Sequence, residues 1–244
     1  MKKLLILCLA LAIGGSAIGQ AKIKLQSADK AQCVKSDMMS LKASFSFSTI
    51  EAENVETKGG QFSQLSMANT VIGGSEGDPQ IPVINELIAV PIGATPSIRV
   101  TSYSSTDYKL NDLGIEKLMP RQPDIFKNQD PKDVPFKYNA AAYQSTRGFR
   151  SEPTARVSVN GTLRGVQIGQ MSIEPVSYDP VNNTIRVFND IEVEVSYNGA
   201  DAKATEDMLV ETYSPYFDVL YKQLFAEEPC RIFTMSILTS GRLP

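Results

Sequence analysis

The chain contains many short segments in which apolar and polar side chains alternate, and this pattern limits what it can fold into. The alternation is clearest in residues 41–48, where the apolar side chains are Leu41, Ala43, Phe45 and Phe47. A period of two buries one face of a β-strand and leaves the other face in solvent. Further strands are expected at 61–69, 83–90, 97–103, 155–159, 163–166, 171–178, 184–188 and 191–197. Short strands at near-regular spacing predict an all-β fold, an antiparallel β-sandwich of the jelly-roll type.

Turn signals separate these expected strands. Asn160-Gly161 is the strongest of them, because both central positions of a type I′ hairpin turn need positive φ. Lys58-Gly59-Gly60 and Asn189-Asp190 are expected to form turns as well. The body of the chain is therefore expected to be a meander of hairpins.

One segment near the C-terminal end has the pattern of an amphipathic helix. Ser214 is suited to be its N-cap and Pro215 its first helical residue. The apolar side chains at helical spacing are Phe217, Leu220, Tyr221, Leu224 and Phe225. Such a face predicts a helix that packs on the sheets or on a partner.

The segment from Leu118 to Phe149 has no sustained period and contains four prolines. A loop of this length is uncommon in a compact domain unless it has a function or is disordered. The segment and the residue that follows it carry six basic residues, Arg121, Lys127, Lys132, Lys137, Arg147 and Arg150.

The 244 residues include no histidine, which excludes several kinds of active site. A Ser-His-Asp triad, a Cys-His dyad and a His-ligated zinc site cannot be built from this chain alone. The carboxylates show no calcium-loop spacing and no recognisable acid/base pair. We therefore expect no catalytic residue, no metal site and no cofactor, and an enzyme that uses only carboxylates is a remote alternative.

The first nineteen residues have the features of a secretory signal peptide. Lys2 and Lys3 precede an apolar run about ten residues long, and small residues follow it. Cleavage after Ala17 and cleavage after Gly19 both satisfy the small-residue rule, and we expect the second, which leaves Gln20 as the new N-terminus. No later segment has the eighteen or so apolar residues of a membrane span. The product is expected to be secreted, periplasmic or on the cell surface.

The expected mature chain is acidic and has few cysteines. Its 22 basic and 27 acidic residues disfavour nucleic acid as a partner. Cys8 lies in the leader, so Cys33 and Cys230 remain. They could pair, although the sequence does not give the distance between them.

Several short motifs occur in a characteristic order along the chain. Residues 77–83 (Gly-Asp-Pro-Gln-Ile-Pro-Val) precede an apolar strand that ends Ala89-Val90-Pro91, and the Pro-rich loop ends Asp133-Val134-Pro135-Phe136. Tyr-Asp-Pro-Val at 178–181 and Thr-Ile-Arg-Val at 184–187 follow, and the apolar helix closes the series. The order and spacing of these motifs resemble the N-terminal propeptide of gingipain-type cysteine peptidases, over roughly residues 41–225.

The resemblance implies a secreted prosegment that assists folding of a peptidase catalytic domain and blocks its active site until it is cleaved. In that family the peptidase cleaves after Lys or Arg, and counting back from Asp133 places Lys127 at the substrate-like position of the inhibitory loop. Arg121 is the second choice. Arg231 is a possible processing site.

The expected organisation is a leader at 1–19, a propeptide domain at 20–228 and a tail at 229–244. The tail departs from the family where the catalytic domain should begin, so it resembles a truncated or frame-shifted remnant, with a natural stand-alone form as the other possibility. A different class of function stays open from the residues alone, an exported β-sandwich that binds a glycan or a surface protein.

Overall fold

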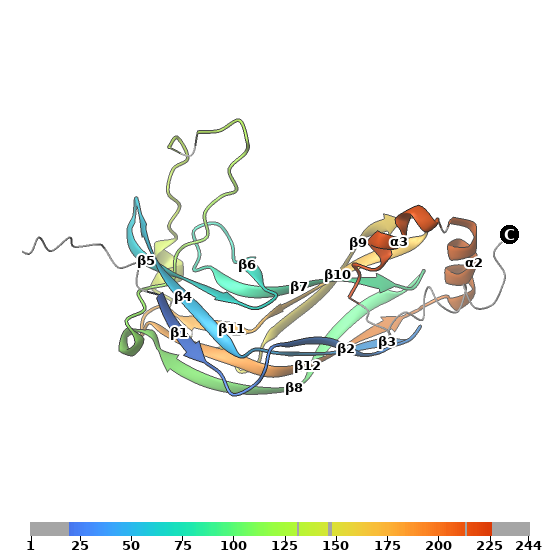
Figure 1. The fold of residues 1–244 in the computed structure, drawn as a ribbon, viewed down its shortest axis with the longest axis horizontal. Coiled ribbons are helices and arrows are strands. Elements are labelled where there is room, and N and C mark those ends of the chain that lie inside the picture. Colours follow the sequence, from blue (N-terminus) through green and yellow to red (C-terminus); the bar gives the residue numbers. More distant parts are fainter. Residues whose placement is uncertain (1–19, 131, 146–147, 213, 226–244) are drawn as a thin grey trace, which may run out of the picture.

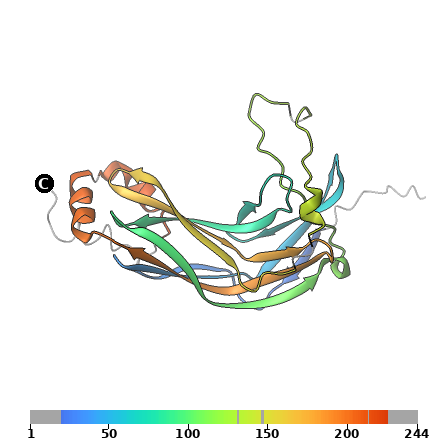
Figure 2. The same ribbon diagram turned by 180° about the vertical axis from the view of Figure 1, so that it is seen from behind.

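The computed structural model describes residues 20–130, 132–145, 148–212 and 214–225. Its strands form two facing layers, with a loop that projects from one end of the body and helices at the other end (Figures 1 and 2). All strand pairs within the sheets are antiparallel. The all-β antiparallel class is therefore confirmed, while a jelly-roll strand order stays a prediction.

The larger sheet is organised around the long strand β12 (Thr184–Asn198). β12 pairs with β8 (Thr95–Lys109) on one side. On the other side it pairs first with β11 (Val176–Asp179) and then with β3 (Ser40–Ser46), which pairs with β2 (Lys30–Ser36).

The prediction of a turn at Asn189-Asp190 is wrong, because β12 continues through both residues. The register with β8 shifts after Asn189, as in a β-bulge. The Asn189 side chain accepts a hydrogen bond from Phe47 N at 2.8 Å and donates one to Phe47 O at 3.0 Å. These bonds satisfy the backbone at the point where the neighbour of β12 changes from β11 to β3.

Two smaller sheets complete the fold. One has the order β6 (Val71–Gly73), β7 (Ile81–Val90), β10 (Val166–Glu174), β9 (Thr154–Leu163). The other has the order β1 (Gln20–Lys24), β4 (Thr49–Thr57), β5 (Gly60–Met67). The chain changes sheet directly between β3 and β4 and between β10 and β11, and these crossings join the sheets into one body.

The hairpin turn between β9 and β10 lies four residues after the expected position. Asn160-Gly161 is inside β9, where the register passes from the Ile168–Gly161 pair to the Gly169–Val159 pair. The turn is Arg164-Gly165, with φ of 46° and 80°, between the paired residues Leu163 and Val166. Both dipeptides can supply the turn, and the longer pairing of β9 with β10 selects the second.

The main core lies between the sheets and contains the alternating side chains that define the strand pattern. Leu41, Ala43, Phe45 and Phe47 are all buried, together with side chains of β7, β10 and β12. Cys33 also belongs to this core and is disulfide-bonded. The other cysteines, Cys8 and Cys230, lie outside the described residues.

The helices differ from the sequence prediction. The segment expected as one helix contains a 3₁₀ turn, η2 (Pro215–Phe217), followed by the single-turn helix α3 (Asp218–Tyr221). The longest helix of the described residues is α2 (Ala202–Thr212), which the sequence pattern does not predict. At its start, Asp201 Oδ1 accepts a hydrogen bond from Ala204 N at 2.9 Å. Phe217, Tyr221 and Leu224 pack in a separate small cluster with Val166 and Leu209.

Two other short helical elements are η1 (Leu110–Leu113) and α1 (Ala140–Tyr143), and they flank the projecting loop in sequence. Within the described residues, no helix has the length and apolar character needed to cross a membrane.

Candidate functional site

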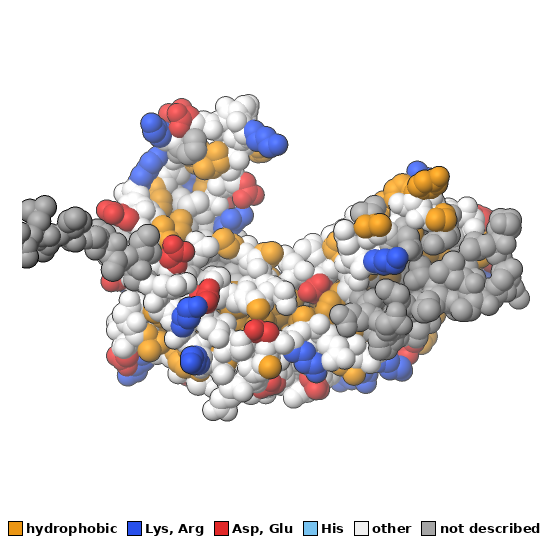
Figure 3. Space-filling view, in the orientation of Figure 1, with side chains coloured by type: hydrophobic (Ala, Val, Ile, Leu, Met, Phe, Trp, Pro, Cys, Tyr) orange, Lys and Arg blue, Asp and Glu red, His pale blue; other side chains and the backbone are white. Residues whose placement is uncertain are grey.

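Residues 121–138 form the projecting loop, which stands away from the sheets at one end of the body (Figure 1). Its outer part carries basic, acidic and hydrophobic side chains (Figure 3). Ile125 and Phe126 are 49% and 69% exposed, and Lys127, the next residue, is exposed as well. Among the described residues, no hydrogen bond or ion pair involves the Lys127 ammonium group.

The chain entering the loop is fixed to the body by its backbone. Ser63 N donates to Lys117 O at 2.9 Å, and Met119 N donates to Ser63 O at 2.8 Å. Gln80 N donates to Met119 O at 2.9 Å. The loop therefore starts from a segment that is paired on two sides.

Tyr143 of α1 also holds this segment from the interior. Its hydroxyl donates to Leu118 O at 2.6 Å, and both residues are buried. Burial, and to a lesser extent the neighbouring Tyr178, Tyr138 and Asp78, raise the pKa of Tyr143 far above its usual value. The hydroxyl stays protonated and remains a hydrogen-bond donor.

Gln122 joins the two legs of the loop. Its Nε2 donates to Lys137 O and to Pro120 O, both at 2.9 Å. Its Oε1 accepts from Lys137 N at 3.0 Å. The side chain therefore pairs with the backbone of the opposite leg much as a neighbouring strand would.

The turn between β4 and β5 supports the second leg. Lys58 Nζ donates to Lys132 O at 2.8 Å. The Phe136 ring lies where a Cβ atom on Gly59 would be, because such an atom would come 2.2 Å from Phe136 Cε1. Phe136 also contacts Phe62 of β5, with ring centroids 6.0 Å apart. A side chain at Gly59 would push the leg away, so glycine is needed at this contact.

The remaining basic residues of the irregular segment are placed differently. The Arg121 guanidinium pairs with Asp124 at 2.9 Å, and Arg121 N donates to Asp78 O at the base of the loop. Lys132 and Lys137 are exposed, and Arg147 lies outside the described residues. Arg150 lies beyond the loop in sequence, and its guanidinium pairs with Glu174.

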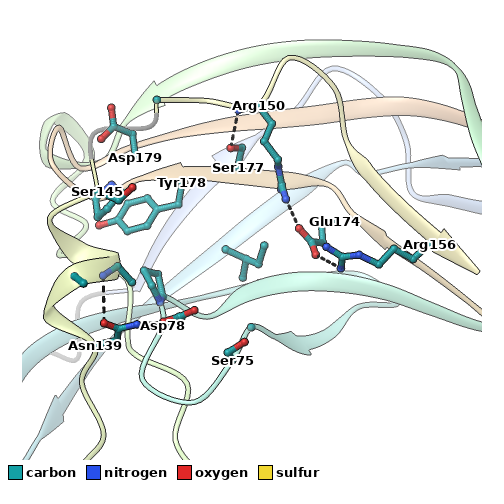
Figure 4. Close-up of a pocket in the computed structure, with 17 residues that line it drawn as sticks. Ser75, Asp78, Asn139, Ser145, Arg150, Arg156, Glu174, Ser177, Tyr178 and Asp179 are labelled. Carbon is teal, nitrogen blue, oxygen red and sulfur yellow. Dashed lines mark hydrogen bonds and ion pairs between the residues drawn. The ribbon is translucent and has the colours of Figure 1, made fainter.

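A cleft of about 880 Å³ opens beside the base of the loop (Figure 4). Glu174 lies between Arg150 and Arg156 in its wall, with Arg156 at 2.8 Å. Asp78 accepts from Asn139 Nδ2 at 2.7 Å, and Asp179 accepts from Asn182 Nδ2 at 2.7 Å. The charged groups of the cleft are thus engaged with one another or with amides.

The other expected site residues are less informative. Gln20 is the first described residue and opens β1, while Gly19 and Arg231 lie outside the described residues. In the part of the chain that the structure describes, no three His, Cys, Asp or Glu side chains come together in a group that could hold a metal ion. Gln122, Lys58 and Gly59 support the loop but have no sequence motif, apart from the expected turn at Lys58-Gly59-Gly60.

Comparison with known proteins identifies relatives of the whole domain. A family model described as Propeptide_C25 matches residues 24–215. Lys-gingipain HG66 of Porphyromonas gingivalis is 46% identical over 227 residues, which cover 92% of this chain and 13% of that protein. Gingipain R1 of the same organism is 26% identical over 239 residues, which cover 97% of this chain and 23% of that protein. The chain therefore spans a small part of the length of these curated relatives.

Solved structures agree with this assignment. One, described as structural insight into zymogenic latency of gingipain K from Porphyromonas gingivalis, has a TM-score of 0.69 and 46% sequence identity, and covers 75% of this chain and 100% of that chain. Another is a complex of Porphyromonas gingivalis RgpB pro- and mature domains, with a TM-score of 0.63 and 21% sequence identity. The match covers 82% of this chain and 97% of that chain, and at this identity it supports the fold only. The chain therefore belongs to the Propeptide_C25 family, the propeptides of gingipain-type cysteine peptidases.

Proposed function

We propose that this domain keeps a Lys-specific cysteine peptidase inactive by placing Lys127 in the pocket that receives the substrate side chain before the cleaved bond. The observation that carries the proposal is an exposed lysine without an ion pair, near the end of a loop whose base is fixed to the body. A pocket selective for lysine holds a buried acceptor for a cation. A lysine that is not paired within its own domain can enter such a pocket without first losing another partner.

The contacts that hold the loop also favour Lys127 as the residue that enters the pocket. Gln122 joins its legs and Lys58 contacts its second leg, so part of the ordering cost of binding is met before the partner arrives. Arg121 fits less well, because its guanidinium is paired with Asp124 and its backbone is bonded at the loop base. Lys127 is therefore the first choice and Arg121 the second.

We infer lysine rather than arginine specificity for the partner from two observations. The residue near the end of the loop is a lysine, and the identity to Lys-gingipain is 46% compared with 26% for gingipain R1. A peptidase catalytic domain of the Lys-gingipain type is the proposed partner, and the same contacts would let the domain assist its folding.

We also propose export, with a leader at 1–19 removed before Gln20, a propeptide domain at 20–228, a tail at 229–244 and processing at Arg231. The support for this leader is its sequence, in which Lys2 and Lys3 precede an apolar run and small residues follow that run. N-terminal sequencing of the exported protein tests the leader.

Inhibition of a purified Lys-gingipain catalytic domain by the full chain tests the role of Lys127. Lys127→Ala should weaken inhibition by roughly 100-fold, which corresponds to about 2.7 kcal/mol of lost binding free energy. Lys132→Ala is the matched control, because Lys132 is an exposed lysine of the same loop whose carbonyl remains available to Lys58. An effect only in Arg121→Ala would move the contact to Arg121, and no effect in either variant would contradict blocking by this loop.

A further inference from the structure

The end of the projecting loop is folded into a tight turn around Lys127. Gln129 N donates a hydrogen bond to Phe126 O at 2.9 Å. The Gln129 side chain makes a second bond to the same residue, because its Oε1 accepts from Phe126 N at 3.1 Å. Lys127 and Asn128 therefore occupy the two central positions of a β-turn that is closed by two hydrogen bonds.

This conformation matters because a peptidase hydrolyses a bond only when the chain on both sides of it is correctly aligned. An extended peptide can run through the active-site cleft of a peptidase. The carbonyl carbon of the bond to be cleaved then lies about 3–3.5 Å from the catalytic thiolate, in the geometry needed for attack. In a turn, the chain reverses direction at the two central residues. Asn128 is then directed away from the path that the residue after the cleaved bond would follow.

We propose that Gln129 makes this loop a blocking element rather than a substrate. The turn lets the Lys127 side chain enter the lysine pocket while the Lys127–Asn128 peptide bond is kept out of the extended conformation that hydrolysis requires. This inference rests on the proposed function and adds the reason why the presented lysine is not cut. Gln129 is a positioning residue, since it acts through the backbone of Phe126.

The supports of the loop help the turn to persist. Gln122 fixes the distance between the legs, and Lys58 and Phe136 hold the second leg against the β4–β5 turn. To become extended at Lys127, the loop would have to open the turn while both legs stay attached. The side-chain bond of Gln129 adds to the resistance at the one place where opening would expose the peptide bond.

Loss of this bond has a defined chemical outcome. In an opened loop, the peptidase thiolate would attack the Lys127 carbonyl carbon and the Asn128 amine would leave with a proton. Water would then release Lys127 from the acyl-enzyme. The net change is one water molecule added across the Lys127–Asn128 bond, giving a carboxylate at Lys127 and an amino group at Asn128.

The experiment incubates the full chain with a Lys-gingipain catalytic domain and follows two readouts over time, residual peptidase activity and cleavage after Lys127 by mass spectrometry. Gln129→Ala should inhibit at first within about threefold of the wild type. Its cleavage after Lys127 should be at least tenfold faster, and its inhibition should decay as cleavage proceeds. Gln129→Glu keeps an oxygen acceptor for Phe126 N, so this variant should resist cleavage after Lys127 as the wild type does. If Gln129 had only a general structural role, Gln129→Glu would not restore this resistance.

Three other outcomes of this experiment would contradict the proposal. The proposal is overturned if Gln129→Ala inhibits and stays as uncut as the wild type, if Gln129→Glu is cut as fast as Gln129→Ala, or if the wild type itself is cut rapidly after Lys127. Asn128→Ala is the control for a change in the turn that leaves both closing bonds in place. If Lys127→Ala inhibits as well as the wild type, the proposed function fails and this inference falls with it, a result distinct from altered cleavage alone.

Discussion

Two glutamines determine the conformation of the projecting loop, and neither belongs to a recognisable motif. Gln122 bonds the backbone of the opposite leg, and Gln129 bonds the backbone of Phe126. A primary amide can donate and accept at once, which suits it to pairing with a peptide group. The chemistry of the expected pocket leaves several basic residues as candidates, and only the family resemblance, by counting back from Asp133, selects Lys127 among them. The glutamines could not, because their role depends on which backbone groups the fold brings within reach.

Glu86 is a residue whose ionisation should oppose folding. It lies on β7 opposite the buried Met171 and on the same side of the strand as the buried Ile84 and Ile88. Burial raises the pKa of the Glu86 carboxyl above its usual value. The folded state therefore binds the proton more tightly than the unfolded state, and its stability falls as the pH rises from the unfolded pKa through the folded pKa.

Glu86→Gln should remove this pH dependence, because it replaces the carboxylate with a neutral group of the same shape. We expect its melting temperature to exceed that of the wild type by about 2–4 °C at pH 8. The advantage should vanish near pH 4, where the wild-type carboxyl is protonated. Thermal melts across this range measure it, with the exposed Glu76→Gln as control. An equal gain at both pH values would show that charge burial is not the cause.

The expected and observed strands and turns show which parts of the fold are determined by the local sequence and which by tertiary contacts. The strand around Phe45 lies where the period of two predicts it, and the strand ending at Val90 lies where an apolar run predicts it, because the burial of both is encoded by their own side chains. Asn160-Gly161 and Asn189-Asp190 are both good turn sequences, yet both lie inside strands. Their neighbours continue pairing past them, and each extra residue is accommodated as an irregularity in the ladder.

At the helical end of the chain, too, the local sequence does not predict the observed elements. α2 has a capping signal at Asp201 but only two buried side chains, Thr205 and Leu209, so its apolar pattern is weak. The segment after Ser214 has a strong apolar pattern, but its side chains are shared between two clusters. Phe217 packs in the small cluster, while Phe225 stacks on Phe45 of the main core with ring centroids 5.4 Å apart. Contacts in two directions favour short turns over one straight helix.

Phe217→Asp should consequently destabilise the C-terminal elements without unfolding the whole domain. Phe217 is partly buried against the small cluster, and the Arg164 guanidinium lies 4.8 Å from its ring centroid. We expect a loss of about 1–2 kcal/mol, less than for a fully buried aromatic side chain. Hydrogen exchange should rise in α2 and α3 and stay slow in β3 and β12.

The neighbouring Tyr216→Asp supplies the control for this change. Tyr216 is 94% exposed, so the same new charge one residue away should leave stability and exchange unaltered. Global unfolding of Phe217→Asp would mean that the small cluster and the main core form one cooperative unit.

At the scale of the whole molecule, the body and the projecting loop are separable. The core lies between the sheets, and the sheet pairings include none of the described residues 123–130 and 132–136. The body contacts these residues through Lys58 and Gly59 of the β4–β5 turn and through Phe62 of β5, while Gln122 joins the legs below them. The fold thus provides a support for the loop, and the inhibitory contact that we propose lies on a segment outside the sheets.

Replacing residues 123–136 with Gly-Ser-Gly-Ser should therefore leave the body folded and abolish inhibition. A shorter loop costs less closure entropy, which offsets the lost contacts of Phe136, so we expect the melting temperature to stay within about 3 °C of the wild type. Inhibition of a Lys-gingipain catalytic domain should fall at least as far as in Lys127→Ala. Co-expression of the shortened chain with that catalytic domain then separates the two proposed roles. If the body alone assists folding, active peptidase should accumulate without inhibition, whereas loss of folded peptidase would assign the folding role to the loop as well.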